Sequence, residues 1–177
     1  MEDLSLHILD IVENSIAAEA DKIEITILED QNKDLLSVEI SDNGKGMDKN
    51  QLNKALDPFY TTKTTRRFGL GLSLLSEAAR SANGDFCITS SVGKGTKVKA
   101  EFQRSHIDRK PIGDMSQTLI TLIMGNPQVD FVYTHKKNSH KYCFDTRKIK
   151  SQLKSNSLYS PEGIKKLRED LKQINKK

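Results

Sequence analysis

Two neighbouring segments alternate apolar and polar residues with the period of a β-strand. Residues 21–30, DKIEITILED, carry isoleucine at every second position, and residues 35–42, LLSVEISD, follow after a short turn. Directly before them, residues 3–20 carry apolar side chains at helical spacing. A sheet with one apolar face and a helix with one apolar stripe are stable only when each buries the other. The sequence therefore predicts a helical layer packed on a sheet.

The rest of the pattern extends this arrangement. Further helices are predicted at 50–56, 70–82, 113–126 and from Ser160 onwards, and further strands within 85–102 and 128–146. The fold class is α+β, a two-layer α/β sandwich, whose first part has an antiparallel sheet covered on one face by helices. We predict two domains: residues 1–104, and a small C-terminal α/β module over residues 105–177.

The charge of the chain changes sign between these two parts. Residues 1–104 carry a net charge of about −4 and residues 105–177 about +8, which together give the +4 of the whole chain. A solvated basic face explains the second value more simply than a nucleic-acid-binding arm, so a protein partner is expected there and nucleic acid is not. No signal peptide or membrane span is predicted, and Cys87 and Cys143 lack metal-site spacing. We expect a cytoplasmic protein.

Three polar residues interrupt the first predicted helix. Asp10 and Asn14 are four residues apart and share one helical face, and Glu13 lies beside them. A carboxylate and an amide on one face can hold a magnesium ion, which prefers a few oxygen ligands and keeps several waters. Simple exposure to solvent explains the same residues equally well.

The second predicted strand runs straight into glycines. In VEISDNGKGMDKN, residues 38–50, Asp42 ends the strand, and Gly44 and Gly46 follow. A carboxylate at this position can accept a hydrogen bond from an exocyclic amine, and glycine lets a flat base approach the backbone. As an isolated motif, a glycine turn accounts for the pattern too.

Two more glycine motifs lie downstream. Gly69 and Gly71 precede a helix whose first N–H groups can receive phosphate, after a loop rich in threonine, lysine and arginine. Residues 93–96, GKGT, close a hairpin, and Thr96 can offer a hydroxyl to a base. The loop is neither a Walker A nor a Rossmann motif, because it lacks GxxxxGK[ST] and does not follow a strand.

The order of these four motifs resembles the Bergerat-type ATP-binding domain shared by gyrase, the heat-shock chaperone of that class, histidine kinases and MutL-type ATPases, over about residues 4–102. The resemblance implies ATP and Mg²⁺ as ligands. It implies that Asp42 binds the adenine amine, that Asn14 ligates magnesium, and that Asp10, or alternatively Glu13, is the catalytic base. The remaining nucleotide-binding residues that it implies are Gly44, Gly46, Met47, Phe59, Thr62, Lys63, Gly69, Leu70, Gly71, Leu72 and Thr96.

One departure from the family pattern affects the chemistry. ATP-hydrolysing members usually have Glu four residues before the magnesium Asn, where this chain has Asp10, which is one methylene shorter. Three functions stay open: a nucleotide-dependent switch with slow hydrolysis, a protein kinase that acts on a separate partner, or a non-catalytic ATP-binding regulator. His7 is expected to be packed in its helix and is a poor candidate phosphoacceptor. The whole chain also resembles small ATP-binding proteins encoded beside iron-only hydrogenase genes, which implies a regulatory or maturation context.

Overall fold

A computed structural model of the chain describes residues 3–55, 70–153 and 157–175. Its strands are β1 (Lys22–Asp30), β2 (Leu35–Asp42), β3 (Phe86–Ser91), β4 (Gly95–Gln103), β5 (Asp130–Lys137) and β6 (His140–Asp145). Its helices are α1 (Leu4–Ala17), α2 (Lys49–Ala55), α3 (Gly71–Ser81), α4 (Met115–Gly125), α5 (Thr146–Gln152) and α6 (Pro161–Leu171), followed by a 3-10 turn, η1 (Lys172–Asn175).

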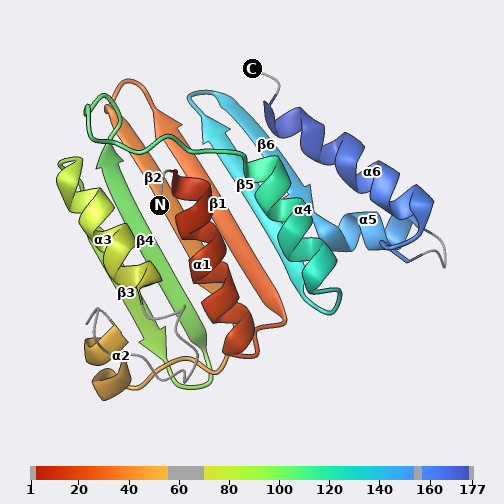
Figure 1. Cartoon of the computed structure of the whole chain (residues 1–177), viewed down its shortest axis with the longest axis horizontal. Helices are drawn as coiled ribbons and strands as arrows, with labels where there is room; N and C mark the ends of the chain where they lie inside the picture. Colours follow the sequence, from red (N-terminus) through yellow and green to blue (C-terminus); the bar gives the residue numbers. More distant parts are fainter. Residues whose placement is uncertain (1–2, 56–69, 154–156, 176–177) are drawn as a thin grey trace.

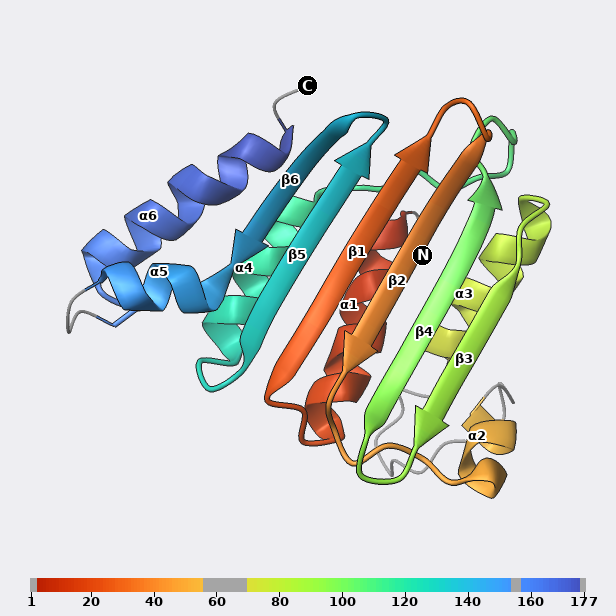
Figure 2. The same cartoon turned by 180° about the vertical axis from the view of Figure 1, so that it is seen from behind.

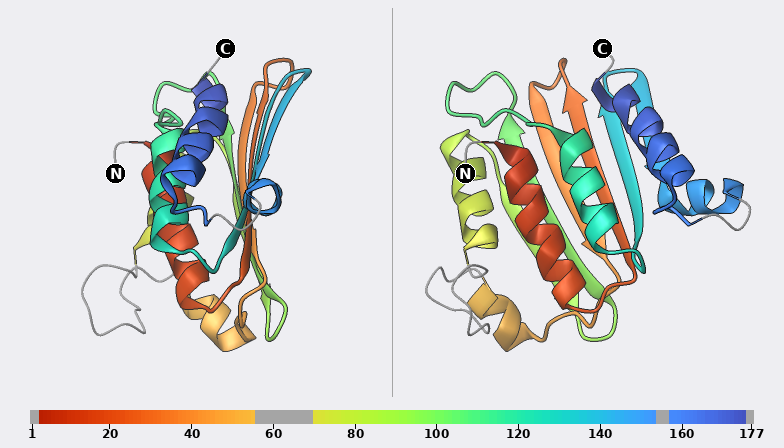
Figure 3. Two further views of the ribbon diagram at one scale, coloured as in Figure 1. Left: turned by 90° about the vertical axis from the view of Figure 1, so that its right-hand side faces the viewer. Right: turned by 45° about the vertical axis from the view of Figure 1, so that its right-hand side comes forward.

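The strands form one sheet, and helices α1, α3 and α4 pack side by side on one of its faces (Figure 1). The strand order is β3-β4-β2-β1-β5-β6. Seen from behind, the strands lie in front of these helices, and the edge-on view separates the two layers (Figures 2 and 3). The predicted two-layer α/β sandwich is confirmed.

The sheet is mixed, although its first part is antiparallel as predicted. Strands β3, β4, β2 and β1 pair antiparallel, whereas β5 pairs with β1 in parallel, with Ile23 opposite Phe131. Phe131 and Tyr133 are fully buried in the same core as Ile23 and Ile25. The division into two domains at residue 104 stays a prediction, and hydrogen bonding along β1 joins the two segments.

Local sequence explains where the helices begin and end. Asp3 caps α1 by accepting a hydrogen bond from the N–H of Leu6, and α1 ends before Glu19, whose φ is +62°. Ser160 caps α6 by accepting from the N–H of Gly163, as its position before a proline predicts. Helix α5 was not predicted, because its seven residues show almost no apolar period; Asp145 caps it.

Candidate functional site

The predicted adenine-binding residues meet at one end of the sheet, where α1, the end of β2 and the start of β4 converge (Figure 1). Asp42 lies at the last position of β2 and Thr96 at the second of β4. The β3–β4 hairpin closes beside them, and its glycine turn contacts the loop after β2, since the N–H of Gly93 donates to the carbonyl of Lys45 at 2.8 Å.

Three donors fix the carboxylate of Asp42. Its Oδ1 accepts the backbone N–H groups of Gly44 at 2.9 Å and Thr96 at 3.1 Å, and its Oδ2 accepts the Ser15 hydroxyl at 2.6 Å. A carboxylate offers about four acceptor positions, so the described residues leave one, on Oδ2. The carboxylate is therefore oriented to accept one more hydrogen bond.

Both predicted glycines after β2 sit where backbone packs on backbone. A Cβ on Gly46 would lie 2.0 Å from the carbonyl oxygen of Ser91, and its φ is +67°. A Cβ on Gly44 would lie 2.6 Å from the carbonyl oxygen of Ala18, at the end of α1. These contacts explain why both positions are glycine, because a side chain at either one would push the loop away from Asp42.

A serine on β3 holds the other side of this loop. Ser90 Oγ accepts the N–H of Met47 at 2.8 Å, contacts Thr96 Oγ1 at 2.9 Å and donates to the carbonyl of Gly95 at 2.9 Å. Met47 and Thr96, both predicted as nucleotide contacts, are thereby tied to the same hydroxyl. The loop after β2 is fastened to the hairpin at two points, here and at Lys45.

Sequence reasoning missed Ser15 and Ser90. Ser15 is buried on the sheet-facing side of α1, directly after Asn14. A hydroxyl on the apolar side of a helix is a signal for a polar partner, but the partner depends on how the helix docks. Ser90 could have been found through its neighbour, because it lies directly opposite Thr96 in the hairpin register.

The polar residues of α1 are half-buried, and one of them touches the start of α3. A Cβ on Gly71 would lie 3.0 Å from the Cβ of Asp10, so the buried Gly71 lets α3 begin against this carboxylate. Burial raises the pKa of Asp10 above its usual value. Asn14 follows one turn later on the same helical face, and Glu13 is also half-buried.

The predicted lid is described only in part. Phe59, Thr62, Lys63 and Gly69 lie outside the described residues. Leu70 is exposed at the N-cap of α3, and the half-buried Leu72 packs against the core. Their roles in binding nucleotide stay predictions.

The oxygen donors of α1 suit magnesium. Carboxylate and amide oxygens are the ligands that it takes from proteins, and it needs only one or two of them when phosphates supply the rest. In the described ranges, no cluster of three or more His, Cys, Asp or Glu side chains could hold a metal by itself. An ion that shares its shell with a nucleotide matches this donor set better than a closed protein site.

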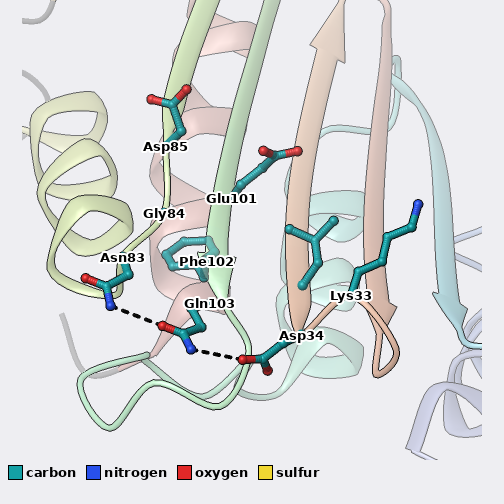
Figure 4. Close-up of a pocket in the computed structure, with 9 residues that line it drawn as sticks. Lys33, Asp34, Asn83, Gly84, Asp85, Glu101, Phe102 and Gln103 are labelled. Carbon is teal, nitrogen blue, oxygen red and sulfur yellow. Dashed lines mark hydrogen bonds between the residues drawn. The ribbon is translucent and has the colours of Figure 1, made fainter.

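A hollow of about 490 Å³ lies at the opposite end of the sheet (Figure 4). It contains none of the predicted site residues. Polar side chains along it bond to one another: Asn83 donates to Gln103 at 3.1 Å, and Gln103 donates to Asp34 at 3.0 Å. Its position makes it separate from the Asp42 site.

Comparison with known proteins identifies the same part of the chain. The family model described as "Histidine kinase-, DNA gyrase B-, and HSP90-like ATPase" matches residues 2–106. The sensor histidine kinase YxdK of Bacillus subtilis is 33% identical over 90 residues, which are 49% of this chain and 27% of that protein. The sensor protein DegM of Bacillus sp. is 35% identical over 91 residues, 51% of this chain and 24% of that protein. The chain thus spans about a quarter of the length of these relatives.

Solved structures share the fold at low identity. The N-terminal domain of a DNA repair protein aligns with a TM-score of 0.61 and 19% identity, over 93% of this chain and 59% of that chain. The MutL ATPase domain of Aquifex aeolicus, solved with ADP, aligns with a TM-score of 0.52 and 20% identity, over 98% of this chain and 70% of that chain. Among the described residues, no helix is both long enough and apolar enough to cross a membrane.

Proposed function

The chain belongs to the family of histidine kinase-, DNA gyrase B- and HSP90-like ATPases, and from this premise we propose that its ATP-binding domain is a nucleotide-dependent regulatory switch with slow hydrolysis. The observation that carries the proposal is the carboxylate of Asp42: three donors orient it, and one acceptor position on Oδ2 is filled by no residue that the structure describes. The 6-amino group of adenine carries N–H donors and can donate a hydrogen bond to this open position.

In this proposal the two ends of the nucleotide contact different elements. The base lies against Asp42 and Thr96, with Ser15 and Ser90 holding these two residues in place. The phosphates lie toward α1 and the start of α3, where Asn14 holds Mg²⁺, which would neutralise phosphate charge. The first N–H groups of α3 have no partner within the helix, so they can receive a phosphate oxygen.

Asp10 is the proposed base for hydrolysis. It lies one helical turn before Asn14, and the start of α3 packs against it. Burial raises its pKa, which makes the carboxylate a better proton acceptor than an exposed Asp. Its side chain is one methylene shorter than Glu, which is the reason for expecting slow turnover. Glu13 is the alternative base.

Transfer of the γ-phosphate to a separate protein is the second candidate function. It is favoured by the sensor histidine kinases among the relatives. His7 is excluded as the acceptor in the folded state, because its side chain is only 3% exposed. The acceptor would therefore belong to another protein, with residues 105–177 as the proposed docking region. The proposed hydrogenase-related context rests on sequence resemblance.

Incubation with ATP labelled on the γ-phosphate tests these alternatives. The switch predicts slow release of labelled phosphate and no labelled protein. A kinase predicts label on a partner when extract is added, with little free phosphate. Binding without either product would favour a non-catalytic regulator, and the absence of any binding would refute the proposal.

A further inference from the structure

The outer edge of β3 presents unpaired backbone groups. Asp85 and Glu101 exchange both of their main-chain hydrogen bonds, at 3.1 and 2.8 Å, which sets the phase of the β3–β4 pair. Asp85 and every second residue after it therefore bond to β4. The residues between them, Phe86, Ile88 and Ser90, point their N–H and C=O groups away from β4. Within the part of the chain that the structure describes, the only outward group of these three with a partner is the N–H of Phe86, which donates to Asp85 Oδ1 at 2.8 Å.

The sequence of β3 itself lacks the devices that prevent strands from pairing. Proteins protect exposed edges with charged side chains, especially lysine, with proline or with bulges. Strand β3, FCITSS, contains no charged residue and no proline, and it pairs with β4 without a break. The opposite edge strand, β6, carries an exposed Lys141. An uncharged strand of this composition readily adds another strand.

We propose that β3 pairs antiparallel with β3 of a second copy of this chain, around a two-fold axis at Ile88. The phase requires outward residues to face outward residues, which sets Ile88 opposite Ile88 and Phe86 opposite Ser90 of the second copy. Cys87 then faces Thr89. Because the strand has no charge, this self-pairing opposes no like charges. The result is a continuous sheet through two molecules.

The same register accounts for an exposed apolar side chain. Val92, in the β3–β4 turn, is 69% exposed. Beyond the paired strands, the register carries Val92 of each copy toward Gly84 of the other. Gly84 lines the hollow of about 490 Å³ at the far end of the sheet (Figure 4). An antiparallel pair thus brings an exposed apolar residue to an open recess, twice by symmetry.

Engineered disulfides test the register directly. Thr89→Cys, in a Cys143→Ser background, places a thiol opposite Cys87 of the second copy at a non-hydrogen-bonded pair. The Cα atoms of such a pair are about 4.5 Å apart, within disulfide reach. Mild oxidation should give a covalent dimer of about 40 kDa, twice the 19.9 kDa of the chain. The matched control, Ser91→Cys in the same background, is also exposed on the same face but faces Asp85, and it should form no covalent dimer under the same oxidation.

Sedimentation of charge variants completes the test. Ile88→Lys brings two lysines together on the axis and should raise the dimer dissociation constant at least about tenfold, whereas Ile88→Thr should keep the dimer. Circular dichroism verifies that each variant is folded. The proposal is overturned if the wild-type chain is monomeric up to about 100 µM. It is also overturned if the Ser91→Cys control cross-links as fast as Thr89→Cys, or if Ile88→Lys leaves the mass unchanged.

Discussion

Acidification should destabilise this fold through His7. This side chain is 3% exposed on α1, and its Nδ1 is buried without a hydrogen-bond partner among the described residues. Burial, assisted by the nearby positive charge of Lys110 and opposed by Asp3, lowers its pKa from 6.5 to about 4. The folded protein therefore holds a neutral imidazole at pH values where the unfolded chain has already bound a proton.

The size of the effect follows from these two pKa values. The stabilisation from neutral His7 is complete above pH 6.5 and is lost as the pH falls toward the folded-state pKa. Each unit of difference between the unfolded-state and folded-state pKa corresponds to 1.36 kcal/mol. The unfolding free energy therefore falls by about 3 kcal/mol in total below pH 4, and about 2 kcal/mol of this is already lost at pH 5. A marginally stable domain would show this clearly.

Urea unfolding of the wild type and His7→Leu between pH 7.5 and 5 measures this loss. The wild type should lose about 2 kcal/mol more than the variant over that range, whatever their stabilities at pH 7.5. His140→Gln, at an exposed histidine in the β5–β6 hairpin, is the control and should follow the wild type. Parallel loss in the wild type and His7→Leu would refute the argument that burial keeps His7 neutral.

Four further predictions concern the site and the fold. Asp10→Asn should reduce ATP turnover by about 10²–10⁴-fold with little change in ATP affinity, while Glu13→Gln keeps most of the activity; the reverse pattern would make Glu13 the base. Because burial raises the pKa of Asp10, its ionised form weakens the fold as the pH rises, so Asp10→Asn should raise the Tm at pH 7 but not at pH 3. Gly46→Ala should lower the unfolding free energy by about 1–3 kcal/mol, since its φ is +67° and a Cβ would meet the Ser91 carbonyl; an unchanged Tm would contradict this packing. Limited proteolysis should leave residues 105–153 attached, because Phe131 and Tyr133 are fully buried; their early loss while the remainder stays intact would show a disordered arm.

The strands near the N-terminus were predictable because their pattern is local. Alternating isoleucines from Ile23 to Ile27 face the helices, as their period requires. The parallel pairing of β1 with β5 was not predictable, since an alternating strand suits a neighbour of either direction. That choice depends on α4, whose packing beside α1 returns the chain to the free side of β1 (Figure 1).

The sequence indicated which residues belong to the site, but it did not predict the contacts between them. Asp42 stood out as a carboxylate followed by glycines at a strand end. Its link to Ser15 spans 27 positions along the chain and depends on how α1 docks on β2. The close approach of Gly46 to Ser91 was hidden for the same reason, because it joins a loop to a distant hairpin.

Calorimetry of nucleotide binding tests the central claim, that Asp42 receives the 6-amino group of adenine. With Mg²⁺ present, the wild type should bind ATP more tightly than ITP, which lacks this amine. Asp42→Asn should weaken ATP binding by about 1.5–3 kcal/mol, the value of a hydrogen bond to a charged group, and should largely remove the preference for ATP. The Tm of the variant shows whether the network around Ser15 and Thr96 survives. A folded Asp42→Asn protein that binds ATP as tightly as the wild type, with the same preference over ITP, would contradict the account.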